Sequence, residues 1–268
     1  MPRKREQIIG SLKRLAIWIL LLASWEAAFR FFQWRDYVFP APSTLARSFI
    51  ELIKPLVAFG GRPLVDGVVV SLLRLAAGFA LSIVLGGLLG VLMWRWKPLD
   101  DFLGPLFLGL QTLPSVCWVP LAVLVIGLNE RGVLFVVVMG SFFAIAIALR
   151  DGLRNIPPIY QRAGAMLGTH GWRMYRYVLL PASLPALASS LRQGFSFAWR
   201  SLMGAELIFA VDRHGLGFVL HIGRELNDVG WVVIAMAVMV IIGITADRFI
   251  FSVLERAIHR RFGLVVAE

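Results

Sequence analysis

Residues 155–181 read NIPPIYQRAGAMLGTHGWRMYRYVLLP and separate two long apolar runs of the chain. The pair of prolines near the start of this stretch ends the preceding helix. Residues 159–167 can then form a short helix, which Gly168 ends with a turn. From residue 171 to residue 180, apolar side chains recur at spacings i, i+3 and i+7, which is typical of an amphipathic helix. The stretch therefore predicts a compact helix–turn–helix, and a loop of this length with its own structure is usually functional.

The segments around this loop are apolar enough to cross a membrane. Of the 268 residues, 59% are hydrophobic and 16% are charged, and the mean hydropathy is +0.78, which excludes an ordinary soluble chain. A helix that crosses a bilayer needs about 20 mostly apolar residues. Six runs meet this need, at about 15–32, 64–94, 102–128, 133–149, 184–211 and 231–254. The first run follows a basic tail as a signal peptide does, but no small-x-small cleavage site follows it, so we expect a retained anchor.

The sequence therefore predicts an all-α polytopic membrane protein with six transmembrane helices in a single domain over residues 1–268. Six spans put both termini on one side, and that side carries 15 of the 27 Lys and Arg residues, against 8 on the other. Because cytoplasmic loops accumulate basic residues, both termini and the 150–183 loop are predicted to be cytoplasmic. Most of the net charge of +11 then reflects topology, so nucleic acid is not an expected partner. One cysteine excludes an internal disulfide, and four scattered histidines predict no metal site.

The loop resembles the cytoplasmic signature of ABC importer permeases, the inner-membrane components of binding-protein-dependent transport. That signature reads Glu-Ala-Ala, three residues, Gly, nine residues, then Ile-x-Leu-Pro. At the same spacing this chain has Arg162-Ala163-Gly164, Gly168 and Val178-Leu179-Leu180-Pro181. Arg162 replaces the signature's Glu and Gly164 its second Ala, so one charge is reversed while the spacing is kept.

The resemblance extends over nearly the whole chain and includes features of the nitrate, sulfonate and taurine branch. These features are Ser71-Leu-Leu-Arg74, Pro114 with Pro120-Leu121, and Ala205-Glu206. The resemblance implies a type I ABC importer fold in a bacterial inner (cytoplasmic) membrane. It also implies that a small anion of this class is moved into the cytoplasm by alternating access.

In that family the loop is a coupling helix that docks on a separate ATPase subunit. This chain has no GxxxxGK[S/T] motif, so ATP and Mg are expected on the ATPase, no cofactor is expected here, and the chain itself is not expected to be an enzyme. The other implied partners are a periplasmic or lipoprotein substrate-binding protein, a second copy of the chain, and membrane lipid. The expected coupling residues are Arg162, Ala163, Gly164, Gly168, Trp172, Leu180 and Pro181.

Other interpretations of the same residues stay open. Taken alone, the loop also fits a basic hairpin that lies on lipid headgroups. The alternative function is an ATP-independent secondary transporter or channel, although no inverted repeat is visible in the sequence. The hypothesis of a membrane-embedded enzyme has no support, because the sequence shows no metal cluster, nucleophile motif or carboxylate pair.

Ionisable groups inside spans are costly, so each is a candidate for function. In the fifth span, Arg192, Trp199 and Glu206 recur every seven residues and share one helical face, with Arg200 on an adjacent stripe. Arg200 lies near mid-depth, where the functional hypothesis is that it attracts an anion to a pathway. The alternative for Arg200, and for Arg74 in the second span, is an ion pair with Glu206 or Asp66. Arg192 fits a structural role better than a role in the pathway.

Small residues and prolines mark two further helices. The second span carries a small residue every fourth position, which lets another span or a second copy approach closely; these residues are Gly78, Ser82, Gly86 and Gly90. In the third span, Pro114 and Pro120 free backbone carbonyls, which predicts either a pathway wall or a packing kink. The candidates for the translocation pathway are Gln111, Pro114, Trp199, Arg200 and Glu206.

Overall fold

The computed structural model describes residues 2–35, 40–56, 59–209 and 214–261, and these residues form helices and no β-sheet. In chain order the elements are α1 (Pro2–Phe32), α2 (Pro42–Ile53), α3 (Pro63–Arg95), α4 (Lys97–Gln111), the 3-10 turn η2 (Ser115–Cys117), α5 (Trp118–Val125), α6 (Glu130–Arg154), α7 (Pro158–Met166), α8 (Gly171–Met174), the π-helical segment η3 (Tyr175–Leu179), α9 (Leu180–Ile208), α10 (Leu216–Glu225), α11 (Val229–Ala246), the π-helical segment η4 (Asp247–Phe251) and α12 (Ser252–Arg261).

Helix α6 is the centre of the bundle, because α3 and α9 both pack along it. Its most apolar stretch is 61% buried, against 28% for α3 and 22% for the run from α11 into α12. Val133, Val136 and Val137 of α6 meet Ala198 and Leu202 of α9 in the largest apolar cluster. A helix that is apolar on all sides is expected to take such a central place.

The strip of small residues on α3 packs against α6. A Cβ atom at Gly86 would lie 2.7 Å from the carbonyl oxygen of Phe142, and Gly90 makes the same close approach one turn later. Between the same helices the hydroxyl oxygens of Ser82 and Ser141 lie 2.8 Å apart. Of the two partners that the sequence leaves open, the structure therefore shows another span of the same chain.

Three helical runs of the described residues are long and apolar enough to cross a membrane: α3, α6 and Val229–Ile258. A fourth is present if α4 and Ser115–Val125 are counted as one bent span. The structure differs here from the expectation of one span over 102–128, because the chain bends by 101° at the break after Gln111. The first and fifth expected spans lie in α1 and α9, and residues 210 and 211 at the end of the fifth lie outside the described residues.

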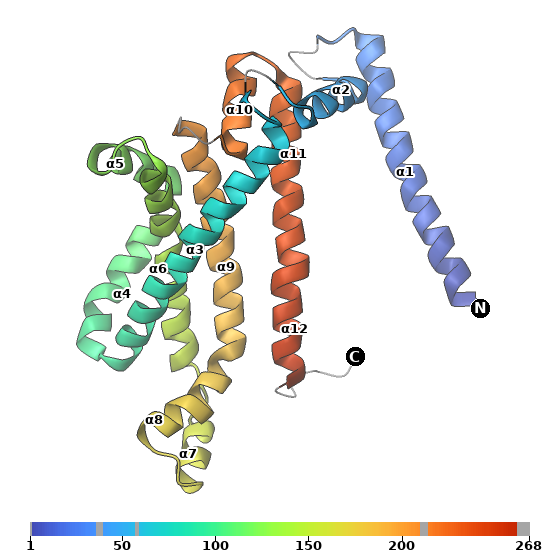
Figure 1. Cartoon of the computed structure of the whole chain (residues 1–268). Coiled ribbons are helices and arrows are strands. Elements are labelled where there is room, and N and C mark those ends of the chain that lie inside the picture. Colours follow the sequence, from blue (N-terminus) through green and yellow to red (C-terminus); the bar gives the residue numbers. More distant parts are fainter. Residues whose placement is uncertain (1, 36–39, 57–58, 210–213, 262–268) are drawn as a thin grey trace.

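Figure 1 shows that the long helices run between two ends of the molecule. Helices α2 and α10 lie at one end and α7 and α8 at the other, and the start of α1 and the end of α12 lie toward the α7–α8 end (Figure 1). Helix α1 stands apart from the bundle and contacts α2, where the hydroxyl of Ser43 donates to Glu26 at 3.0 Å. Helix α2 packs on α11 and α3 through the buried side chain of Leu52, so the bundle consists of the described helices from α2 onward.

Candidate functional site

Helices α7 and α8 form a helix–turn–helix at the free end of the bundle (Figure 1). Gly168 makes the turn with a φ of +78°, in the left-handed region that glycine adopts without strain. Both the amide and the hydroxyl of Thr169 donate to the carbonyl oxygen of Gly164, at 2.9 and 2.6 Å. These bonds close the turn and fix the second helix relative to the first.

The second helix of the loop continues into the bundle without a break. From Gly171 to Ile208 the chain is helical throughout α8, η3 and α9, so the helix has no break between the loop and the fifth expected span. In η3 the amide of Leu180 donates to the carbonyl oxygen of Tyr175, five residues back. This wider turn lies directly before Pro181 and accommodates a ring that an ordinary helical turn would exclude. The loop and the fifth span therefore form one continuous helical rod.

Gly164 lets the two helices of the loop lie against each other. A Cβ atom at this position would lie 2.9 Å from Thr169 Oγ1 and 3.0 Å from both Met174 Sδ and Val178 Cγ2. The replacement of the signature's alanine by glycine thus has a physical reason in this chain. At the base of the loop Tyr175 packs on Trp94 of α3, with ring centroids 6.2 Å apart.

The outer surface of the loop is apolar at its tip and positively charged around it. Met166 is 89%, Leu167 84% and Trp172 73% exposed. Arg162, Arg173 and Arg176 are also exposed, and residues 152–205 contain no Asp or Glu. Among the other expected coupling residues, Ala163 is exposed, whereas Leu180 and Pro181 are half-buried at the base of the loop.

At the opposite end, Arg74 and Glu206 form a buried ion pair. Arg74 Nη1 donates to Glu206 Oε1 at 2.8 Å, and Arg74 Nε donates to Glu130 Oε2 at 2.8 Å. Arg74 is 6% and Glu206 2% exposed. Glu206 is one of the alternative partners expected for Arg74 from the sequence, whereas Glu130 was not expected. The other named partner, Asp66, instead accepts the amide of Arg62 at 2.6 Å.

The same cluster holds the start of α10 in place. Ser71 donates its hydroxyl to Glu206 Oε2 at 2.7 Å and accepts the amide of Leu216 at 2.8 Å, and the amide of Gly217 donates to Glu206 at 3.0 Å. A carboxylate is favourable at the positive end of a helix. Glu206 thus joins α3, α9 and α10, and it lines neither of the two hollows described below.

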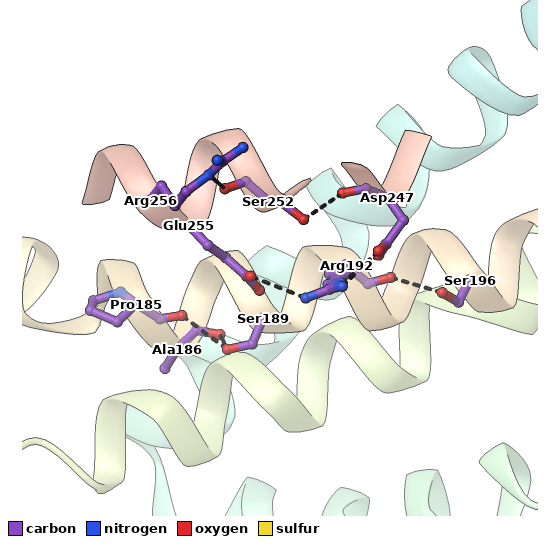
Figure 2. A network of polar contacts seen from close by, with 9 residues as sticks. All are labelled: Pro185, Ala186, Ser189, Arg192, Ser196, Asp247, Ser252, Glu255 and Arg256. Carbon is purple, nitrogen blue, oxygen red and sulfur yellow. Dashed lines mark hydrogen bonds and ion pairs between the residues drawn. The ribbon is translucent and has the colours of Figure 1, made fainter. Parts of the chain in front are cut away.

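Arg192 forms a second ion cluster, nearer the α7–α8 end (Figure 2). Its guanidinium donates to both carboxylate oxygens of Asp247, at 2.6 and 2.7 Å, and to Glu255 at 3.1 Å. Asp247 opens η4, and Ser252 closes that wider turn by donating to the carbonyl oxygen of Asp247 at 2.9 Å. Figure 2 shows how these contacts connect α9 with η4 and α12.

Arg200 lies between two hollows on either side of α9. We call the first the break hollow; it has a volume of about 280 Å³ and includes Gln111, Pro114 and Arg200 in its lining. The second, the α9–α11 hollow, has a volume of about 660 Å³ and includes Trp199 in its lining. Arg200 is the one residue common to the two linings.

The Arg200 guanidinium forms no ion pair with a carboxylate in the part of the chain that the structure describes. Its Nε donates to the carbonyl oxygen of Ser196 at 3.0 Å, and its Cζ lies 4.9 Å from the ring centroid of Phe197. Over the described ranges, no three His, Cys, Asp or Glu side chains gather in a way that could hold a metal ion.

Several membrane-crossing helices around a central one, a helix–turn–helix at one end and a broken helix beside an arginine define a polytopic transport protein. Over residues 82–261 the chain matches the family described as "Binding-protein-dependent transport system inner membrane component", and it belongs to that family. Its relatives include permeases named for three anions. The nitrate import permease protein NrtB of Synechocystis sp. is 28% identical over 79% of this chain and 77% of that protein.

The chain is also similar to two further permeases and to one solved structure. The bicarbonate transport system permease protein CmpB of Synechococcus elongatus is 28% identical over 68% of this chain and 65% of its own length. The putative aliphatic sulfonates transport permease protein SsuC of Bacillus subtilis is 27% identical over 92% of this chain and 86% of that protein. A chain of the MetNI methionine ABC transporter in an inward-facing conformation has a TM-score of 0.61 at 20% identity, covering 73% of this chain and 96% of that one. The likeness shows that the chain has the fold of a type I ABC importer permease.

Proposed function

We propose that this chain is the translocation subunit of an ATP-driven importer that moves a small oxyanion from a binding protein into the cytoplasm. The nitrate and sulfonate names of its relatives support the expected class of nitrate, sulfonates or taurine, and CmpB adds bicarbonate to that class. We place the chain in a bacterial inner membrane as one permease domain over residues 1–268. Six spans in α1, α3, the bent α4–α5 pair, α6, α9 and α11–α12 would leave both termini in the cytoplasm.

The observation that carries this proposal is the exposed tip of the loop formed by α7 and α8. Met166, Leu167 and Trp172 are exposed apolar side chains of this loop, which lies at one end of the bundle (Figure 1). Exposed apolar patches with polar surroundings mark sites of protein contact. A cationic rim without acidic residues suits an acidic cleft in the partner. The partner that fits is the ATPase subunit, which would bind ATP and Mg, since this chain has no phosphate-binding loop.

The helical rod from Gly171 to Ile208 provides a path for the movement. When ATP closes the ATPase dimer, the loop would be displaced and the rod would carry that displacement to the Arg74–Glu206 cluster at the other end. Two copies of the chain around one pathway would then open outward to accept the anion from a periplasmic or lipoprotein binding protein. Hydrolysis would return them to the inward-facing state.

Reconstitution tests this proposal directly. The chain, co-expressed with its ATPase, is purified and placed in liposomes with the binding protein outside, and uptake of labelled nitrate, bicarbonate and taurine is measured with ATP or ADP inside. We expect uptake with ATP alone. Uptake that continues without ATP, or a complex that purifies without an ATPase, would contradict the proposal and favour a secondary transporter or channel.

The coupling role of the loop is tested by replacing Gly168 with valine. A Cβ atom at Gly168 meets nothing within 4 Å, so the substitution acts through the backbone, at a cost of about 1–2 kcal/mol for the left-handed conformation. We expect ATP hydrolysis to continue while uptake falls at least about tenfold. The strained turn changes the position of the docked loop, and the rod is then misaligned. Gly60→Val is the matched control, since Gly60 has a φ of +64° and equally open space at the other end of the molecule. If ATP hydrolysis is coupled to uptake equally well in the two variants, the loop is not the coupling element.

A further inference from the structure

The break between α4 and η2 encloses a hollow that is large enough for a small hydrated anion. Its lining includes residues 110–116 together with Met139, Phe197 and Arg200. At about 30 Å³ for each water molecule, its volume of about 280 Å³ corresponds to about nine waters. Discontinuous helices at membrane depth place such hollows where a protein binds ions or substrates.

The charge of Arg200 is not balanced by the protein around it. Arg74, Arg150 and Arg192 each pair with two carboxylates within 3.1 Å, whereas Arg200 has no carboxylate partner within the described ranges. The Arg200 side chain is exposed and lines the break hollow, so an anion that enters the hollow can reach its guanidinium. Within the described ranges, Arg200 and Arg248 are the span arginines that form no ion pair, and of these two Arg200 alone lines the break hollow.

Two neutral polar groups in the same hollow also have no partner. The Oε1 atom of Gln111 is buried and accepts no hydrogen bond from the described residues, and the hydroxyl of Ser115 makes none with them. Thr112, by contrast, donates its hydroxyl to the carbonyl oxygen of Gly109 at 2.6 Å. Buried polar groups in native proteins are normally satisfied, so an unpartnered amide beside a hollow points to a ligand or to ligand-bound water.

We propose that the break hollow is a binding site for a single small oxyanion, which accepts hydrogen bonds from the guanidinium of Arg200, the amide Nε2 of Gln111 and the hydroxyl of Ser115, while Gln111 Oε1 accepts from water bound with the anion. This inference rests on the proposed function, because it makes the hollow a station on the import pathway. Its lining contains no acidic residue, whereas the α9–α11 hollow on the other side of Arg200 is lined by Asp247. The anion is therefore expected on the side of α9 that faces the break.

Thiol chemistry tests the site without requiring transport. Cys117 is the chain's one cysteine, so the C117S variant provides a background in which Ser115→Cys places a thiol in the lining. The purified complex is treated with sulfonatoethyl methanethiosulfonate or with trimethylammonioethyl methanethiosulfonate, two reagents of similar size and opposite charge. We expect the sulfonate reagent to react roughly tenfold faster relative to its rate with free thiol, as for one unit charge near contact in a partly hydrated site.

Two arginine variants locate the cation. We expect Arg200→Gln to abolish the preference for the sulfonate reagent and Arg248→Gln to leave it unchanged, since Arg248 lines only the α9–α11 hollow of the two. Excess nitrate, bicarbonate or taurine should slow the sulfonate reagent in the parent and not in Arg200→Gln. Gln111→Leu should weaken this protection, which a role confined to helix packing would not produce.

The outcomes separate the site from the proposed function. Equal reaction rates for the two reagents, or a preference lost in Arg248→Gln and kept in Arg200→Gln, would overturn the site even if uptake requires ATP. Conversely, a charge preference with protection by the anions, found together with uptake that needs no ATP, would support the site and contradict the importer.

Discussion

At the scale of single residues, Arg74 and Glu206 determine the stability of the end of the bundle that carries α10. Both are buried, so removing Arg74 leaves Glu206 charged and without a cationic partner among the described residues, in a low-dielectric site. We expect Arg74→Ala to lower the free energy of unfolding by about 3–5 kcal/mol, measured by thermal or denaturant unfolding of the purified complex in detergent. Arg224→Ala is the control, because the exposed Arg224–Glu225 pair contributes no more than about 1 kcal/mol.

The double variant Arg74→Met with Glu206→Met extends this test. Replacing both members of a buried ion pair by apolar residues of similar size is often close to neutral, since neither charge then has to be desolvated. We expect the double variant to be more stable than Arg74→Ala. If it is less stable than Arg74→Ala, the hydrogen bonds of Glu206 to α10 contribute more than the ion pair does.

The residues of this cluster also show what the sequence could and could not predict. Arg74 and Glu206 are charges inside apolar runs, so their pairing could be proposed as an alternative before the structure was known. Glu130 could not be added, because it begins α6 after a short connection and reaches Arg74 only through the close packing of α3 on α6. Arg200 remained ambiguous for the same reason, since no local pattern tells a neutralised arginine from an unneutralised one.

At the scale of elements, the contact between α3 and α6 depends on particular glycines. A Cβ atom at Gly86 would lie 2.7 Å from the carbonyl oxygen of Phe142, whereas one at Gly87 meets nothing within 4 Å. We expect Gly86→Val to cost about 1–3 kcal/mol through overpacking and Gly87→Val to cost less than half as much. Unfolding midpoints and the yield of assembled complex measure both variants. Equal losses would mean that helix propensity, not the contact with α6, decides the effect.

The bend after Gln111 shows the limit of hydropathy as a guide to elements. Residues 102–128 form one apolar run in the sequence, and both halves stay apolar after the bend of 101°. Proline content does not locate the bend either, because Pro105 lies inside α4 and Pro185 inside α9 without ending those helices. What distinguishes Pro114 is that the chain turns around it against α6 and α9, a tertiary contact that no local sequence pattern records.

At the scale of the whole molecule, the two ion clusters and the loop are all attached to the same rod. Helix α9 carries Arg192 toward one end and Glu206 toward the other, and the loop is its direct extension. A continuous helix therefore connects α8 with the contacts between Glu206 and α10. The function that we propose requires that the loop face the ATPase in the cytoplasm and that α10 face the binding protein outside.

This requirement gives the last prediction, which concerns the sidedness of the chain. In the C117S background, Lys97→Cys lies at the start of α4, next to the end of α3 that packs on the loop, and Leu226→Cys lies between α10 and α11. Both positions are exposed, so an impermeant maleimide can reach each of them from its own side of the membrane. We expect spheroplasts to label Cys at 226 and inverted vesicles to label Cys at 97, because basic loops stay in the cytoplasm. The reverse pattern would place the loop outside, where no ATPase can meet it, and would exclude the coupling mechanism whatever the family of the chain.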